Sequence, residues 1–193
     1  FHEFGLLQSI FPILETISLK EIERRLEPTQ SYPKDAPLIG HLLELFPSFD
    51  LKEALELCQY LKLSRADLQF VTFWFQAKAY SQENQTFELF EWAYLYAHSS
   101  FPICLQMAAF HVPPEKRAHF LEHHQKQIQL LAPAIERIQT SRPLVTAQDL
   151  LDSGIAPGKK IGVLLKLAEN ISINEHLQDK ANVLSLLQAT PEW

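Results

Sequence analysis

The stretch LLDSGIAPGKKIGVLLKLA, residues 150–168, contains three of the five glycines in this chain of 193 residues. The three glycines are four residues apart, and the middle one follows Pro157 and precedes two lysines. Isoleucine and leucine then recur at intervals of three and four residues, which is typical of an amphipathic helix. The stretch therefore predicts a turn that leads into a helix, and two explanations for its glycines are open.

The first explanation is a binding site for phosphate. The N-terminus of a helix presents unpaired N–H groups and a partial positive charge, so it attracts anions. Gly158 has no side chain to keep a phosphate from the backbone, and Gly162 leaves room for a neighbouring helix or a ligand. Two lysines add charge, so the pattern fits a contact that positions a nucleic-acid backbone without reading its bases. The candidate RNA-binding residues are Gly154, Pro157, Gly158, Lys159, Lys160, Gly162 and Lys166.

The second explanation is a simple stop between two helices. In this interpretation Gly154 ends the first helix, Pro157 initiates the next one, and the lysines are only solvated. A loop that binds a nucleoside triphosphate is not indicated, because the glycine–lysine spacing differs and no serine or threonine follows the lysines. Spacing alone leaves the phosphate site and the stop as alternatives.

The rest of the chain predicts helices and no convincing strand, so we expect an all-α fold. We expect an irregular multi-helix body over residues 1–140 and a smaller helical tail over residues 144–193. Pro143 is the expected joint between them, and the glycine-rich turn lies in the tail.

Apolar residues at spacings of three and four define the individual helices. Asp50 is a predicted N-cap, because Glu53 follows it by three residues, and Ser64 is predicted to cap the next helix. Pro12 is expected to bend or divide the first helix and Pro133 to kink the longest one. The expected helical segments are residues 3–26, 38–47, 48–63, 64–82, 84–99, 101–112, 114–139, 158–173 and 174–190, with a short helix after Thr146.

Composition excludes several classes of protein. Hydrophobic residues make up 47% and charged residues 21% of the chain, which allows a sizeable core and argues against disorder. The net charge of −6 argues against a wholly basic surface but not against a local basic patch. Cys58 and Cys104 lack metal-ligand spacing, so we expect buried thiols in a reducing compartment. Since no membrane-spanning run and no signal peptide are visible, we expect a cytoplasmic protein without a membrane partner. The chain lacks an initiator methionine, and we expect it to be a piece of a longer protein.

The segment RAHFLEHHQK, residues 117–126, offers a second set of candidate residues. His119 and His123 are four apart and share a helix face, a spacing that can hold zinc. No third ligand is evident, so an exposed helix face is the expected outcome and a metal hydrolase is the weaker alternative. With Lys116, Arg117 and Lys126, the same helix either follows an RNA backbone or is simply solvated.

Two further features carry little chemistry. The aromatic run of residues 70–101 is compatible with base stacking, but most of its rings fall at helical core positions. No motif of a nucleophilic or acid–base active site occurs, and we therefore expect no catalytic and no metal-binding residues in this chain.

The tail resembles a known family of enzymes. Residues 146–168 are similar to the C-terminal segment of class II bacterial tRNA nucleotidyltransferases (CCA-adding enzymes) and the related poly(A) polymerases. Two upstream stretches, residues 5–14 and 60–71, resemble other segments of the family, in the same order. The matching tail positions are Asp149, Leu150, Leu151, Gly154, Ile155, Pro157, Gly158, Ile161, Gly162 and Leu165.

The resemblance implies a role in RNA processing. Members of the family have a catalytic head with metal-binding carboxylates, a neck that selects the nucleotide, and a helical body and tail that hold RNA. This chain would correspond to the body and tail, so the parent protein would be an enzyme that uses Mg²⁺ and nucleoside triphosphates. The chain itself would dock tRNA or another RNA 3′ end, not DNA, and would need no cofactor of its own. Residues 32–47 carry no histidine–aspartate metal motif, so no phosphohydrolase activity is expected.

The resemblance leaves one competing function and two open properties. A helical protein-interaction module without an RNA role is the alternative, in which the glycine stretch merely joins helices. The choice between CCA addition and adenosine addition lies in the neck, outside this chain. The sequence carries no signal for an oligomeric state.

Overall fold

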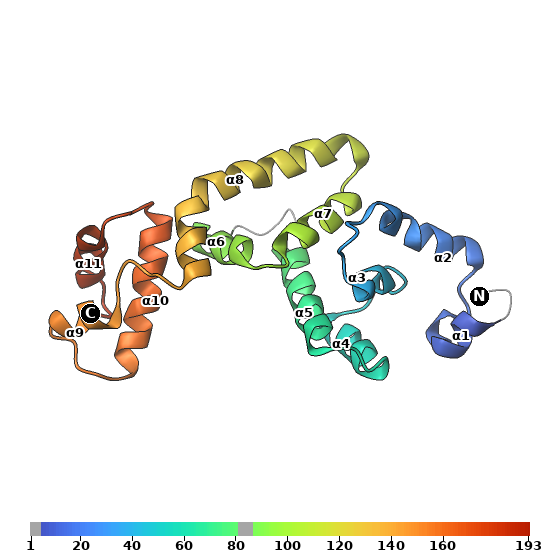
Figure 1. The fold of residues 1–193 in the computed structure, drawn as a ribbon, viewed down its shortest axis with the longest axis horizontal. Coiled ribbons are helices and arrows are strands. Elements are labelled where there is room, and N and C mark those ends of the chain that lie inside the picture. The colour runs from blue at the N-terminus through green and yellow to red at the C-terminus, as the bar shows by residue number, and fades with distance from the viewer. Residues whose placement is uncertain (1–4, 81–86) are drawn as a thin grey trace. The chain divides into compact units, whose positions relative to one another are not determined.

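The computed structural model describes residues 5–80 and 87–193, and these residues are all-helical, without any strand (Figure 1). The predicted fold class is confirmed. The α-helices are α1 (Leu6–Ile10), α2 (Leu19–Leu26), α3 (Leu38–Leu43), α4 (Leu51–Tyr60), α5 (Arg65–Tyr80), α6 (Leu89–Ala97), α7 (Phe101–His111), α8 (Pro114–Thr140), α9 (Ala147–Asp152), α10 (Lys159–Asn174) and α11 (Lys180–Gln188). Two 3-10 helices are η1 (Pro12–Leu14) and η2 (Glu27–Ser31).

Prolines and side-chain caps set many of the helix boundaries. Pro12 divides the expected first helix into α1, η1 and α2, because proline lacks the N–H that would continue the ladder. The predicted cap of α4 is present: Asp50 accepts from the Glu53 N–H at 2.8 Å, and Glu53 accepts from the Asp50 N–H at 2.9 Å. Ser64 caps α5 in the same way, through the Asp67 N–H at 3.2 Å. The expected caps at the starts of α4 and α5 are confirmed.

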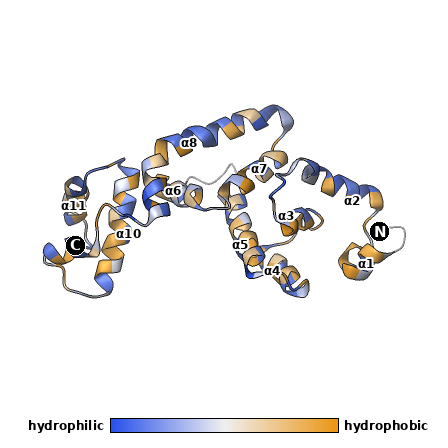
Figure 2. Cartoon of the chain, viewed as in Figure 1, coloured by the Kyte–Doolittle hydropathy of each residue, from blue (hydrophilic) through white to orange (hydrophobic). Residues whose placement is uncertain are grey.

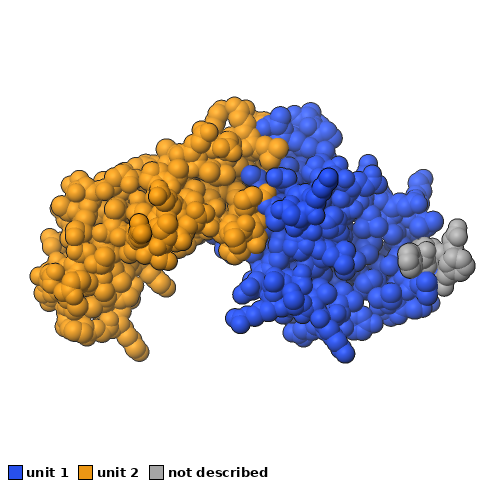
Figure 3. Space-filling model, in the orientation of Figure 1, with its two compact units in different colours: residues 1–81, 103–118 blue, residues 82–102, 119–193 orange. Residues whose placement is uncertain are grey.

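The chain forms two compact units (Figure 3). Unit 1 contains residues 1–81 and 103–118, and unit 2 contains residues 82–102 and 119–193. Both α7 and α8 therefore contribute residues to each unit. The expected joint near Pro143 falls inside unit 2, so the division of the chain into a body and a tail stays a prediction.

In unit 1, α5 packs against α4 and α3. Leu68, Val71, Phe75 and Ala79 recur at helical spacing, which predicts an apolar stripe on α5, and the structure buries this stripe only in part. Of these four, only Val71 is buried, whereas Phe70, Phe73, Trp74 and Ala77 complete the buried face. The large rings next to the predicted stripe remove more apolar surface from water when they turn inward, so they determine which face is buried.

In unit 2, α10 packs against α6, α9 and α11. Residues 144–193 form a separate hydrophobic core. Both α9 and α10, the helices on either side of the turn, contribute buried residues to this core. The fully buried residues of this core are Val145, Leu150, Leu164, Ala168, Val183 and Leu187. Figure 2 shows hydrophobic and hydrophilic residues mixed along α10, as expected for a helix with one buried side.

Other expectations concern single residues and the membrane. Both cysteines are free and buried, as predicted. The longest helix, α8, contains Pro133 within its span and is not divided there. Within the described ranges, none of the helices combines the length and the apolar character that crossing a bilayer requires.

Candidate functional site

The first glycine of the turn ends α9. Gly154 has φ +88°, a conformation that side-chain-bearing residues rarely adopt. Its N–H donates to the Leu151 carbonyl at 2.9 Å, and the Ile155 N–H donates to the Leu150 carbonyl at 3.1 Å. These two bonds form a Schellman motif, which satisfies carbonyl groups at the end of a helix. The local structure therefore accounts for Gly154 as a helix stop.

The second glycine begins α10 and leaves the helix start open. Gly158 is the N-cap, with φ +155° and ψ −169°, a region that is essentially restricted to glycine. It has no side chain to accept a hydrogen bond, and the backbone N–H groups of Lys159 and Lys160 have no acceptor among the described residues. Pro157 precedes the N-cap, so the helix is not initiated by proline as the second explanation assumed. The unsatisfied N–H groups remain available to a ligand.

The neighbouring helices of the same segment have closed N-termini. At the start of α9, the Thr146 hydroxyl accepts from the Asp149 N–H at 3.3 Å, and Asp149 accepts from the Thr146 N–H at 2.8 Å. At the start of α11, Asp179 accepts from the Asn182 N–H at 3.0 Å. A side-chain oxygen already occupies the position that an anion would take at these two ends. The start of α10 differs from both.

All seven residues predicted to contact RNA are exposed to solvent. A Cβ atom added at Gly154, Gly158 or Gly162 would meet no atom within 4 Å. Gly162 was expected to leave room for a neighbouring helix or for a ligand. No helix packs against it, so the first of these alternatives is wrong and the second stays open. The backbone at the start of α10 is therefore not covered by neighbouring side chains.

The three lysines of α10 are in different situations. The Lys160 ammonium donates to the Trp193 carbonyl oxygen at 2.7 Å, so it is engaged within the chain. Lys159 and Lys166 have no hydrogen-bond or ion-pair partner within residues 5–80 and 87–193. They are seven residues apart, so helical geometry places them on one side of α10 about 10 Å apart along its axis. Gly162 and the exposed Val163 lie between them. This exposed strip, residues 159, 162, 163 and 166, is called the α10 strip.

An ion pair joins α9, the helix before the turn, to α11. Lys180 of α11 donates to Asp149 of α9 at 2.7 Å. Hydrogen bonds from Lys180 and Thr146 lower the pKa of the Asp149 carboxyl to about 2. Asp149 is therefore charged at neutral pH, and the acid that the family resemblance includes serves here to cap α9 and to join it to α11.

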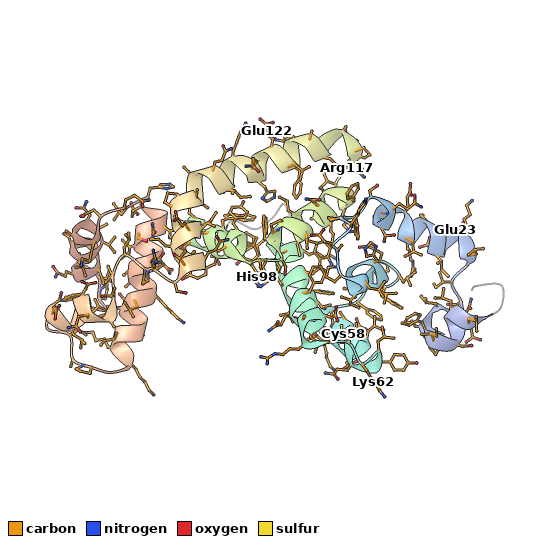
Figure 4. The ribbon with its side chains drawn as sticks, viewed as in Figure 1. Glu23, Cys58, Lys62, His98, Arg117 and Glu122 are labelled. Atoms are coloured by element: carbon orange, nitrogen blue, oxygen red, sulfur yellow. The ribbon has the colours of Figure 1, made fainter. Side chains whose placement is uncertain are left out.

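The histidines of α8 differ in their surroundings. His119 and His123 are exposed, and the described residues contain no cluster of three possible metal ligands. Glu122, labelled on α8 in Figure 4, forms an ion pair with Lys126 at 2.7 Å. The adjacent His124 is buried, and its Nδ1 lies 3.0 Å from the Tyr96 hydroxyl. The expected exposed face is confirmed for His119 and His123, whereas the burial of His124 was not foreseen.

The aromatic run is core only in part: five of its eleven rings are buried, five are half-buried, and Tyr94 is exposed. Tyr94 on α6 is 50% exposed. It lines a cleft of about 360 Å³ in unit 2, called the Tyr94 cleft, together with residues from α8 and α10. Its lining residues are Tyr94, Arg137, Ile138, Ser141, Pro143, Leu165, Lys166 and Glu169. Of this set the sequence indicated only Lys166 as a candidate contact residue, because the lining residues come from distant parts of the chain.

The carboxylate of Glu169 is unusual within the Tyr94 cleft. Glu169 is only 8% exposed, and its Oε1 accepts no hydrogen bond. The nearest cationic atom, Arg137 Nη2, lies 3.6 Å away from this oxygen. Burial raises the pKa of the Glu169 carboxyl, although Arg137 opposes the shift. A polar i, i+3 pair such as Lys166 and Glu169 gave no signal in the sequence, because such pairs are common on helix surfaces.

Comparison of the chain with protein-family models, curated proteins and solved structures gave no match. The resemblance to the nucleotidyltransferase family therefore stays a prediction that depends on the residues quoted above.

Proposed function

We propose that this chain docks an RNA strand, in the manner of the body and tail of a template-independent RNA nucleotidyltransferase. The RNA backbone lies on the α10 strip, where it accepts hydrogen bonds from the N–H groups of Lys159 and Lys160. The ammonium groups of Lys159 and Lys166 neutralise phosphates on the same side of the helix. The contact positions the strand and does not read its sequence.

One observation carries this proposal: the start of α10 is open, and two of the three lysines of this helix are unpaired among the described residues. Gly158 provides no capping oxygen, and neither Lys159 nor Lys166 has a partner among the described residues. A partial positive charge and unsatisfied donors at a helix N-terminus favour phosphate. The exposed position of Gly162 supports the same proposal, since a helical glycine without a packing role costs about 1 kcal/mol relative to alanine.

On this proposal, the chemistry belongs to the rest of the parent protein. The parent transfers CCA or adenosine nucleotides to the 3′ end of tRNA or another RNA, using Mg²⁺ and nucleoside triphosphates. This chain contributes no catalytic group and holds the RNA while another part extends it. We place this activity in the cytoplasm, where such RNAs are processed.

A protein-interaction module is the second candidate, and one groove in unit 1 favours it. The groove has a volume of about 370 Å³ and is lined mainly by apolar and aromatic residues of α1, η1 and α4. Ile10, Ile13 and Tyr60 contribute to it and are each between 47% and 63% exposed. Exposed apolar side chains that gather in one place are typical of contact surfaces between proteins.

The proposal is tested by reversing the two unpaired charges of the α10 strip. The double variant Lys159→Glu, Lys166→Glu is expected to bind fluorescein-labelled tRNA at least about tenfold more weakly at low salt. Two lost phosphate contacts also reduce the slope of log K against log salt concentration by about one to two. Fluorescence anisotropy over a salt series measures both quantities.

The matched control makes the same charge change on α8. Lys116→Glu with Lys126→Glu should leave the affinity and the salt slope near those of the unchanged chain. If the α10 variant binds tRNA with unchanged affinity and slope, the glycine-rich stretch is only a linker. The protein-interaction module would then be the better account.

A further inference from the structure

The Tyr94 cleft contains a buried acceptor whose hydrogen-bonding capacity is not used. Glu169 Oε1 lacks a hydrogen bond, and so does the buried Nε of Arg137, which lines the same cleft. The other guanidinium nitrogens of Arg137 donate to the Gln178 side chain at 3.2 Å and to the Ser172 hydroxyl at 3.2 Å. A buried carboxylate oxygen without a hydrogen bond is unfavourable even where Arg137 Nη2 lies 3.6 Å away, and a bound group that donates an N–H bond would relieve this cost.

The shape and composition of the cleft suggest a planar ligand. Tyr94 presents half of its surface to solvent, and Leu165 and Pro143 add apolar lining beside it. An exposed aromatic ring is a stacking surface for a nucleobase, because every base has a flat π-face. The buried carboxylate of Glu169 lies among the same lining residues, so a base stacked on Tyr94 has an acceptor for an amino group.

Charge distinguishes a nucleotide from a basic peptide as the occupant. The charged residues that line the cleft are Arg137, Lys166 and Glu169, which sum to a net charge of +1. A lysine or arginine side chain of a partner would meet two cations and one anion. A nucleotide combines a neutral base with an anionic phosphate, so its base suits Glu169 and its phosphate suits Lys166.

The cleft is also continuous with the α10 strip. Lys166 belongs to both, and Glu169 follows it by three residues, or about 4.5 Å along the helix axis. A phosphate held by Lys166 therefore brings its own base to the mouth of the cleft.

We propose that the Tyr94 cleft binds one unpaired base of the docked RNA strand, with the base stacked on Tyr94 and its exocyclic amino group donating to Glu169. This proposal rests on the proposed function and adds base selectivity to it. Cytosine, adenine and guanine carry an exocyclic amino group, whereas uracil offers only its ring N3–H, which lies between two carbonyl oxygens that repel a carboxylate. The cleft therefore favours these three bases over uracil at a single position of the strand.

The experiment compares fluorescein-labelled RNA oligomers of ten cytidines and ten uridines, bound to the full chain at fixed salt. The unchanged chain is expected to bind the cytidine oligomer several-fold more tightly. Glu169→Gln should remove most of this preference, since the anionic acceptor is lost. Tyr94→Ala should weaken binding of both oligomers by about tenfold through lost stacking, and Tyr94→Phe should restore it. Because Tyr94 is exposed, its variants report on binding without disturbing the core.

The outcomes separate this inference from the proposed function. If both Tyr94→Ala and Glu169→Gln leave affinity and base preference unchanged while the α10 charge reversal still lowers the salt slope, the inference fails and RNA docking stands. If the unchanged chain binds neither the cytidine nor the uridine oligomer, the proposed RNA docking and this inference are both overturned. Two further results overturn the inference alone: cytidine monophosphate competing as well as the oligomer, or an arginine-rich peptide binding in a Glu169-dependent manner.

Discussion

Residues 116–126 of α8 and residues 158–166 at the start of α10 both combine exposed positions with cationic side chains, but they differ in what those cations contact. On α8, the Arg117 guanidinium donates to the carbonyl oxygens of Val112 at 3.0 Å and Phe110 at 3.2 Å. It also lies 5.0 Å from the centre of the Phe110 ring. Lys126 is paired with Glu122, so of the three cations of this stretch only Lys116 lacks a partner for its side chain among the described residues. On α10 the proportion is reversed: Lys160 donates to Trp193, whereas Lys159 and Lys166 have no partner among the described residues.

The number of positive charges on a helix therefore does not identify a binding surface. A guanidinium that satisfies carbonyl groups at the end of a helix contributes to folding, and moving it toward a phosphate would break those bonds. A lysine without a partner gives up only its contacts with water when it binds a phosphate, because it has no hydrogen bond within the protein to break. We therefore expect the cations of α8 to have mainly a structural role and those of α10 to have a binding role.

The largest expected effect concerns the buried histidine of α8. Burial and the neighbouring His123 lower the pKa of His124 to about 4, while in the unfolded chain its pKa is about 6.5. The unfolded state therefore binds the proton more readily, and stability falls as the pH drops from about 6.5 to about 4. The loss over this window is about 3 kcal/mol, measured by urea unfolding at a series of pH values.

The control for this prediction is His124→Phe, which keeps a ring among Trp92, Tyr96 and Phe120 but cannot be protonated. Its stability should depend less on pH between 6.5 and 4. An equal pH dependence in both proteins would mean that other groups titrate and that His124 is not the buried neutral ring described here.

A smaller pair of effects, of opposite sign, concerns two glycines of the turn. Gly158→Ala is expected to destabilise the chain by about 1–3 kcal/mol, because alanine is strained at φ +155°. Gly162→Ala is expected to stabilise it by about 0.5–1 kcal/mol, because alanine favours the helix and its methyl group meets no neighbour. Thermal unfolding measures both changes.

The more stable Gly162→Ala variant should nevertheless bind RNA several-fold more weakly, since the added methyl group lies on the α10 strip. Gain of stability with loss of binding is the combination that a purely structural role would not produce. Unchanged tRNA affinity in this variant would remove Gly162 from the contact.

The features that sequence predicted well are those that depend on near neighbours. The caps at Asp50, Ser64 and Thr146 each need one partner three residues away. At the end of α9, Gly154 donates to the residue three positions earlier, and Ile155 donates to the residue five positions earlier. The exposure of the glycine-rich turn follows from the same local pattern. These features could therefore be read from spacing alone.

The features that sequence missed depend on residues far apart in the chain. His124 is buried because Tyr96, 28 residues away, lies against it. The Tyr94 cleft combines residues 94, 137 and 169, and nothing near any of the three indicates the others. Spacing alone indicated only part of the buried face of α5, because spacing does not show which rings the neighbouring helices cover.

Backbone amide NMR during titration with tRNA is the sharpest test of whether the open start of α10 binds an RNA backbone. The Lys159 and Lys160 amide signals are expected to shift on binding and to return at high salt. The Asp149 and Asn182 amides, already bonded to Thr146 and Asp179, serve as internal controls and should stay in place. Shifts confined to residues 116–126 of α8, with the α10 amides unmoved, would contradict the claim.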